Sequence, residues 1–378
     1  AYDALVASIV AEVAGVKYFT LAEALAANGD ITLLKDVADE VVVSKVVSII
    51  KNGYVANVVA ADGYEVIETE EAYNVYTAIA NKFDILGVTM TLGSSLSLDF
   101  AIDMANLSGE DNYAVMSIAY PDGSESEPIV VPQSEWTQFS GTIYTAKFTG
   151  IAAKQMNDVI TAVVYNANGQ AVSNEKKDCI EAFAVRMLNS LDEKKDAKTL
   201  TLFVDMLNYG AAAQTEFKYD VKKLANRNMT EKHKGWATES VETTDNRKMG
   251  VGCIGSTLTL ASEIQLDLIF ANATVGSDYN DLYAIASYVD HNGIAQTVRI
   301  EGTSFIHYNN DWCQVSVVSM AVADFRSVVH CVIYDSTGEE ITYVDDSVES
   351  FANRNMDKLG ATADAILKFS ASSYNYFH

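Results

Sequence analysis

The side chains that could do chemistry are spread along this sequence without forming a catalytic motif. A nucleophilic triad needs a serine or cysteine, a histidine and a carboxylate held together in space. Of the five histidines, only His307, in the stretch SFIHYNN, lies in a polar loop rich in aromatic residues. The sequence contains no GxSxG, HExxH or P-loop pattern, and no GxGxxG that opens a helix. We therefore expect a protein that is not an enzyme.

Two aspartates occupy matching places in similar stretches. Asp99 and Asp267 each alternate with apolar residues, and a pair of carboxylates is the equipment of a glycosidase. Alternation with period two is typical of a strand with one buried face. We interpret both aspartates as residues of the polar, solvated face of a sheet.

Two further acidic loops could bind a cation. GEDN (109–112) and GSDYND (276–281) offer several oxygens, and calcium prefers oxygen ligands. Neither loop fits the EF-hand pattern, so turn chemistry alone is the favoured interpretation. No cofactor is certain, and calcium is the cofactor considered, with these candidate ligands: Asp111, Asp278 and Asp281.

The four cysteines do not have the spacing of a metal site. None belongs to a CxxC pair, and no histidine lies at ligand spacing from them, which argues against zinc. Cys313 and Cys331 flank an expected antiparallel pair of strands centred near Val322. They could form a cross-strand disulfide, or they could remain as two buried free thiols.

Aromatic residues are candidates for ligand binding and for assembly. Sugar-binding modules stack rings on exposed aromatics, and four such side chains fall at matched loop-adjacent positions: Trp136, Phe139, Phe305 and Tyr308. Packing in the core or at the rim of a sheet is the alternative role. At the C-terminus, an exposed aromatic end is a candidate contact between copies: Tyr374, Tyr376 and Phe377.

Composition limits the classes of partner. The chain has 378 residues, of which 49% are hydrophobic, so it can fold into two or three domains. Its formal net charge of −25 disfavours nucleic acid and anionic membranes as partners. No apolar run is long enough to span a bilayer, so we expect no membrane insertion. The opening residues carry Asp3 and Glu12 and are not expected to be a signal peptide.

These residues are positioned by a duplicated module. TMTLGSSLSLDF (89–100) resembles TLTLASEIQLDL (257–268), and the similarity continues through YAVMSIAYPDG (113–123) and YAIASYVDHNG (283–293). The two copies are offset by about 170 residues. Alternating apolar residues followed by Asn or Asp and Gly predict strands joined by tight hairpin turns.

Each set of strands is followed by two amphipathic helices. Ile180, Phe183, Ala184, Met187 and Leu188 recur at helical spacing in the first copy, and MLNYGAAAQTEF (206–217) lies over ILKFSASSYNYF (366–377). The expected fold class is α+β, with antiparallel β-sandwich-like modules, each followed by a helical pair, in tandem duplicate.

Four segments are expected along the chain. They are an N-terminal domain of helices and short strands (1–82), module copy 1 (83–229), a linker or excursion (230–250) and module copy 2 (251–378). In the N-terminal domain, residues 3–14 are predicted to be helical. Residues 20–30 are predicted to form a second helix, with Thr20 as its N-cap and Gly29 as its stop.

Two stretches resemble modules of large secreted surface proteins of Gram-positive anaerobes. YFTLAEALAANGDITLLKDV (18–37) resembles the first coil of a β-solenoid-like module of those proteins. MLNYGAAAQTEFKYDVKKLAN (206–226), with YGAAAQ at 209–214, resembles one of their repeat modules, whereas copy 2 has FSASSY (369–374) there. The resemblance implies secretion and a place in a modular surface protein, and it carries no catalytic residues.

The hypothesis from the sequence is therefore a non-catalytic extracellular or cell-surface protein with a structural or adhesive role. It could assemble with itself into a fibre or surface layer, with other copies or neighbouring surface proteins as partners. The alternative is a carbohydrate-binding surface protein that uses its loop aromatics, with glycans as partners.

Overall fold

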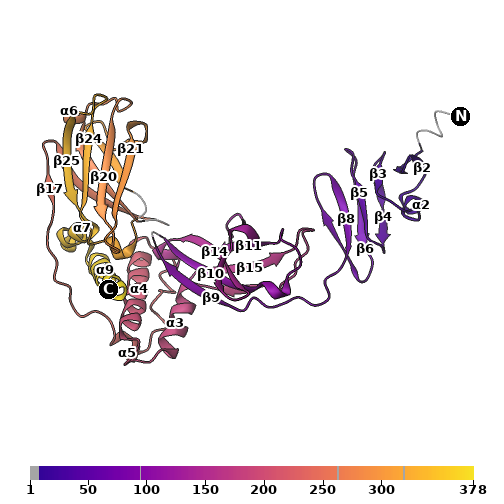
Figure 1. The fold of residues 1–378 in the computed structure, drawn as a ribbon, viewed down its shortest axis with the longest axis horizontal. Helices are drawn as coiled ribbons and strands as arrows, with labels where there is room; N and C mark the ends of the chain where they lie inside the picture. The colour runs from indigo at the N-terminus through magenta and orange to yellow at the C-terminus, as the bar shows by residue number, and fades with distance from the viewer. Residues whose placement is uncertain (1–7, 94, 262–263, 318–319) are drawn as a thin grey trace.

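Antiparallel sheets and a small group of helices make up this chain, which belongs to the α+β class. The structure, a computed structural model, describes residues 8–93, 95–261, 264–317 and 320–378. Figure 1 shows three β-rich units in a bent row: a small N-terminal domain and two sandwiches, here called module 1 and module 2. The longest helices lie at the bend between the two modules.

Module 1 is a sandwich of two four-stranded antiparallel sheets. The first sheet contains, in spatial order, β13 (Thr137–Ser140), β14 (Ile143–Ile151), β10 (Leu96–Asp103) and β9 (Gly87–Leu92). The second contains β12 (Ile129–Pro132), β11 (Tyr113–Ala119), β15 (Val159–Tyr165) and β16 (Lys176–Asp178).

Module 2 repeats this arrangement with one additional edge strand. Its first sheet contains β18 (Cys253–Leu260), β19 (Ile264–Ala271), β23 (Trp312–Val317) and β22 (Ile306–His307). Its second contains β17 (Lys248–Met249), β25 (Glu340–Asp346), β24 (Val329–Tyr334), β20 (Tyr283–Val289) and β21 (Ala295–Glu301).

The alternation seen in the sequence builds the sandwich cores. On β10, Leu98, Phe100 and Ile102 are fully buried, and on β19 the equivalent side chains are Leu266, Leu268 and Phe270. All six belong to one apolar cluster that extends through both modules. Because successive side chains of a strand point to opposite faces, this spacing puts one face of each sheet into the core.

Equivalent tyrosine pairs confirm the offset between the modules. Tyr113 and Tyr165 stack across β11 and β15 with ring centroids 5.5 Å apart, and Tyr283 and Tyr334 stack across β20 and β24 at 5.2 Å. Both members of the second pair lie about 170 residues after their counterparts. A cross-strand aromatic pair on a sheet surface stabilises that pairing.

The predicted helical pairs are present in both modules. They are α3 (Ile180–Ser190) with α4 (Ala197–Glu216), and α7 (Val348–Arg354) with α9 (Ala361–Phe377). In module 2 a short helix, α8 (Met356–Leu359), precedes α9, and Gly360 separates the two with a positive φ of 48°. The first helix of each pair begins at an equivalent N-cap, Cys179 or Ser347, whose side chain accepts a backbone hydrogen bond from the first turn.

An aspartate–arginine pair is also duplicated. Asp178 accepts hydrogen bonds from the guanidinium of Arg186, and Asp346 accepts one from that of Arg354 at 2.6 Å. Each aspartate also accepts the backbone N–H of the following N-cap residue. The pair ties the last strand of a module to its first helix, so the sandwich and the helices are fixed relative to each other.

The second helices of the two modules pack against each other. Tyr209 on α4 and Phe369 on α9 stack with ring centroids 5.5 Å apart, and both side chains are buried. These two residues occupy equivalent positions in the aligned helices, so the modules meet in an approximately two-fold arrangement. Figure 1 shows α4 and α9 side by side at the bend.

The segment between the modules is an ordered connection. After α5 (Glu231–Lys234), the backbone N–H and hydroxyl of Thr238 donate to the carboxylate of Asp205 on α4. Further along, the backbone N–H of Asn246 donates to Ser350 on α7 at 2.7 Å. Each end of the segment is thereby attached to a different module.

The N-terminal domain has its own apolar cluster, drawn from residues 11–75. Its main sheet contains β2 (Val16–Tyr18), β1 (Ala11–Val13), β3 (Ile31–Leu33), β5 (Val47–Ile50), β8 (Ala72–Thr77) and β7 (Tyr64–Glu68). A second, two-stranded sheet pairs β4 (Val37–Val43) with β6 (Ala56–Ala60).

Parallel pairing distinguishes this domain from the two modules. β3 pairs in parallel with β5, and β4 pairs in parallel with β6. The chain therefore runs through β3 and β4 and then, in the same directions, through β5 beside β3 and β6 beside β4.

One expectation for the N-terminal domain is wrong, and a second is confirmed except for the end of the helix. Within the predicted helix at 3–14, residues 3–7 lie outside the described residues, and Ala11–Val13 form strand β1. The reason is Ala14–Gly15, where both residues have positive φ and turn the chain back into β2. The second helix, α2 (Leu21–Leu25), begins at the predicted cap Thr20, in a capping box with Glu23, but ends before Gly29.

Among the residues that the structure describes, no helix is long and apolar enough to cross a membrane.

Candidate functional site

The four candidate ligand-binding aromatics divide into a buried and an exposed pair. Trp136 and Phe305 are 6% and 7% exposed, and the Trp136 indole N–H donates to the carbonyl of Val131 at 3.1 Å. Each of these two follows a short 3₁₀ turn that directs it into its sandwich. Phe139 and Tyr308 are 63% and 52% exposed. Only the second pair remains available to a ligand.

The candidate calcium ligands lie in loops whose hydrogen bonds are internal. Asp278 accepts the backbone N–H and the side-chain amide of Asn280. Next to Asp111, Asn112 is buried and donates to the carbonyl of Gly109 and to Gln133. In the described part of the chain, no three histidine, cysteine, aspartate or glutamate side chains converge as metal ligands would.

The predicted solvated face at Asp99 and Asp267 is wrong, because both side chains are buried. Thr91 donates its hydroxyl to Asp99 at 2.6 Å, and the equivalent Thr259 donates to Asp267 at 2.7 Å. The ammonium of Lys147 lies 3.9 Å from Asp99. Threonines on the neighbouring strand satisfy one oxygen of each carboxylate, whereas the other oxygen of Asp267 is buried without a hydrogen-bond partner among the described residues.

The strands that carry Cys313 and Cys331 are not paired with each other. β23 pairs with β19 and β22, whereas β24 lies in the opposite sheet between β20 and β25. Both cysteines are buried free thiols. The expected hairpin is absent because residues 322–324 form a 3₁₀ turn, after which the chain crosses to the other sheet.

Burial makes the described cysteines poor nucleophiles. It raises the pKa of Cys179, Cys253 and Cys313 to about 11, and that of Cys331 to about 12. The thiolate is the reactive form of a cysteine. At neutral pH these side chains are therefore thiols.

The histidines have partners other than a nucleophile. His307 Nδ1 lies 3.0 Å from the Tyr279 hydroxyl, which donates to Asn272. His291 contacts the buried carboxylate of Asp324 through both its backbone N–H and its ring. Tyr279 thus links His307 to Asn272, and this chain of contacts holds the loop in place.

The aromatic C-terminus is partly exposed on α9. Tyr374, Tyr376 and Phe377 are 37%, 42% and 41% exposed. The Phe377 ring lies 5.0 Å from that of His291, and the Arg326 guanidinium lies 5.1 Å from the Tyr374 ring. These side chains form an aromatic surface beside the cationic Arg326, at the end of the module 2 helix.

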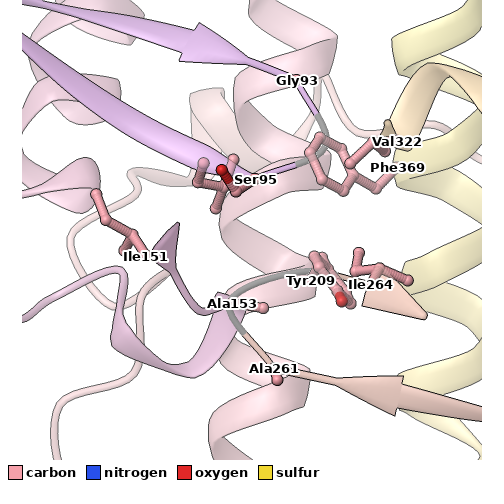
Figure 2. A pocket seen from close by; sticks show the side chains of 10 residues that line it. Gly93, Ser95, Ile151, Ala153, Tyr209, Ala261, Ile264, Val322 and Phe369 are labelled. Atoms are coloured by element: carbon pink, nitrogen blue, oxygen red, sulfur yellow. The ribbon is translucent and has the colours of Figure 1, made fainter. Parts of the chain in front are cut away.

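A small cavity lies where the two modules meet. Figure 2 shows Tyr209 and Phe369 on its wall, with Ala153 and Val322 as another equivalent pair. Its volume of about 20 Å³ is enough for a single water molecule. The Tyr209 hydroxyl is buried and has no hydrogen-bond partner among the described residues. This cavity is part of the joint between modules and is too small for a substrate.

A much larger cleft, here called the asparagine cleft, lies at one end of module 1, beside the connector from the N-terminal domain. Its volume is about 500 Å³, in the range of small-molecule sites. The connector after β8, the loop after β10 and the turn after β15 all contribute to its lining. Five of its lining residues are asparagines: Asn81, Asn106, Asn112, Asn166 and Asn168.

The sequence interpretation missed these asparagines. They are far apart along the chain, and each by itself is typical of a turn. The available signal was that all five precede or follow strands whose loops are expected at one end of the first sandwich.

Comparisons with known proteins give little further information. No protein-family model matches the chain, and no curated protein matches it. A solved structure that matches is a two-domain fibronectin type III segment from chicken tenascin, with 10% sequence identity. The match covers 69% of this chain and 98% of that chain with a TM-score of 0.16. Because a TM-score this low carries no information about the fold, the α+β class is assigned from the sheets and helices of this chain alone.

Proposed function

We propose that this chain is a non-catalytic structural or adhesive protein of an extracellular surface. The observation that carries the proposal is the construction of the molecule as a bent row of three β-rich units with a specific joint between each pair (Figure 1). Such a row holds its ends at a fixed separation, which is the property that a spacer or scaffold needs.

The joint between the N-terminal domain and module 1 is formed by the turn after β15. The Gln170 amide donates to the carbonyl of Thr77 at 2.8 Å and to the carboxylate of Glu65. Gly169 packs closely on Ile67, because a Cβ atom built at Gly169 would lie 3.2 Å from the Ile67 side chain. These contacts, made by buried Gln170, restrict rotation of the domain about its connector.

The joint between the modules is formed by α4 and α9. Aromatic stacking of Tyr209 on Phe369 and continuation of one apolar cluster through both modules make this contact resemble a domain core. Large apolar contacts of this kind oppose the relative motion that is usual between domains.

Charge and the resemblance of 18–37 and 206–226 to surface-protein modules support an extracellular place. A formal net charge of −25 keeps copies soluble at high local density and repels anionic polymers. The exposed aromatic side chains of Tyr374, Tyr376 and Phe377 offer a contact through which copies could assemble.

Two experiments test the proposal. Small-angle scattering and negative-stain microscopy of the full chain should give a bent particle of constant length, and light scattering should show association that Tyr376→Ser with Phe377→Ser removes. Intact source cells should be labelled on this protein by a membrane-impermeant biotin reagent. A flexible particle that stays monomeric at all concentrations, or labelling only after lysis, would contradict the proposal.

A further inference from the structure

We propose that the asparagine cleft binds a neutral saccharide, and that it is the adhesive site of the molecule. The proposal rests on the proposed surface function and names the ligand class of that function. It places binding at one end of module 1, beside the connector from the N-terminal domain, away from the loop aromatics that the sequence suggested.

The lining of the cleft contains no charged side chain. The chain as a whole carries 51 acidic and 26 basic residues. A cationic ligand would meet no carboxylate in the cleft, and an anionic ligand would meet no cation and would be repelled by the net charge of the chain. The lining therefore selects for an uncharged, polar ligand.

Three of the five amides are free to bind. The side chains of Asn81, Asn106 and Asn168 are exposed, and within the described residues they donate or accept no hydrogen bond. Each carboxamide offers two donors and an acceptor. A sugar hydroxyl is likewise a donor and an acceptor, so adjacent hydroxyls of a ring can pair with such amides without transfer of charge.

The polar rim surrounds an apolar floor. Phe83, Leu107 and Val172 line the cleft, and all three pack against the core of the modules. A saccharide ring has an apolar face of C–H groups that can lie on such a floor while its hydroxyls reach the amides. An extended peptide would also need backbone partners from a free strand edge, and the cleft is lined instead by a connector and turns.

Module 2 shows that the turn itself does not require asparagine. Asn166 accepts the backbone N–H groups of Asn168 and Gln170, both at 3.0 Å. In the equivalent turn of module 2, Asp335 accepts those of Thr337 and Glu339 at 2.8 and 2.9 Å. Aspartate thus accepts the same two backbone N–H groups, although the Asn166 amide also donates to Gln170 Oε1 at 3.3 Å. An amide at 166 leaves the cleft uncharged where aspartate would not.

The test measures binding of soluble neutral hexasaccharides by calorimetry and by saturation-transfer NMR. The probes are cellohexaose, xylohexaose, mannohexaose and chitohexaose, with hexagalacturonate as the anionic comparison and a Gly-Ser decapeptide as the peptide comparison. We expect the full chain to bind at least one neutral hexasaccharide and to bind neither comparison probe. Asn81→Ala and Asn106→Ala should each weaken binding about tenfold, since one neutral hydrogen bond contributes up to that factor.

Matched exchanges between the two turns serve as controls. Asn168→Thr and Asn166→Asp give module 1 the residues of module 2 and should weaken binding about tenfold or more. Thr337→Asn and Asp335→Asn make the reverse changes in module 2 and should leave the affinity unchanged. Asn81 and Asn106 are exposed, so circular dichroism and the thermal midpoint of those variants should match the parent chain.

Several outcomes would overturn the inference. They are no binding of any neutral hexasaccharide, binding of the peptide alone, affinities of the cleft variants within twofold of the parent, or loss of binding only in Phe139→Ala with Tyr308→Ala. The proposed function fails by different measurements, namely a flexible monomeric particle or the absence of surface labelling. If the chain is rigid and surface-labelled but binds no saccharide, the saccharide site is rejected while the proposed scaffold function still stands.

Discussion

Module 1 and module 2 keep the same internal contacts and differ at the turn that follows β15 in module 1 and β24 in module 2. Both have a stacked tyrosine pair, a buried aspartate with a threonine partner, and an aspartate–arginine pair at the first helix. In module 1, Gly169 and Gln170 at the end of the turn contact the N-terminal domain, whereas Gly338 and Glu339 at the equivalent places in module 2 are exposed. The two modules therefore share their internal contacts, whereas the turn after β15 and the turn after β24 have different neighbours.

The largest expected effect is a difference in the free energy of unfolding between variants of the two aspartate–arginine pairs. The Arg354 side chain is 14% exposed, whereas that of Arg186 is 54% exposed. Asp346→Ala should lower the free energy of unfolding by about 4 kcal/mol, because the buried guanidinium of Arg354 loses one of its two carboxylate partners. Asp178→Ala should cost about 1–2 kcal/mol, since water can solvate Arg186.

Urea unfolding followed by tryptophan fluorescence would measure both losses, because Trp136 reports on module 1 and Trp312 on module 2. Glu301→Ala, which removes the exposed partner of Arg299, is the control and should change stability by less than about 0.5 kcal/mol. Equal losses from Asp178→Ala and Asp346→Ala would contradict the idea that burial distinguishes the pairs.

A pH effect on stability is expected at Asp158 in module 1. Burial raises the pKa of Asp158 from 3.8 to about 6, although the Tyr219 hydroxyl donates to it, while the equivalent residue of module 2 is Ser327. The protonated form is favoured in the folded state, so this contribution to stability is complete below pH 3.8 and is lost as the pH rises through about 6. Asp158→Asn should therefore stabilise the chain by about 1–2 kcal/mol at pH 7.5 and by less at pH 4.5.

Urea titrations of this variant and its parent at the two pH values would show the difference. Ser327→Ala provides the comparison in module 2 and should give the same change at both pH values. A constant effect of Asp158→Asn across this range would reject the assignment.

A smaller effect is expected at the joint between modules. Tyr209→Phe removes a buried hydroxyl without a partner among the described residues, and it should stabilise the joint by about 1 kcal/mol. Phe369→Tyr adds a hydroxyl at the equivalent place and should destabilise it by a similar amount. Differential scanning calorimetry would measure the shift in midpoint, and opposite signs are required for the two variants.

The smallest effect is expected from the turn exchange itself. Asn166→Asp and Asp335→Asn should each change the free energy of unfolding by less than about 0.5 kcal/mol, because both side chains accept the same two backbone N–H groups. Chemical denaturation would measure this. A loss of 2 kcal/mol or more would mean that asparagine at 166 is required for folding, and its role in the cleft would then need another explanation.

Much of the module architecture could be predicted from alternation and spacing. Leu98 and Leu266 lie in equivalent strands as the repeat required, and the helical stripes at 180–188 and 206–217 lie on helices. The local pattern is sufficient to predict these elements because each strand or helix buries one face, and the spacing of apolar residues shows which face it is.

Solvent exposure could not be predicted in the same way. Asp99 reads as a solvated residue by alternation, but threonine and lysine side chains on adjacent strands cover it. Trp136 and Phe139 are three residues apart, and the 3₁₀ turn that precedes Trp136 directs the first of them into the core. The asparagine cleft was out of reach for the same reason, because its residues are brought together by tertiary structure alone.

The stacked rings of Tyr209 and Phe369 lie where, in a symmetric dimer, one residue would meet its own copy. In such a dimer every substitution at the axis occurs twice, so a tyrosine could only face a tyrosine. A single chain that holds both halves escapes this restriction, because each ring is encoded separately. YGAAAQ at 209–214 can face FSASSY at 369–374, and each half is free to change while its partner preserves the fit.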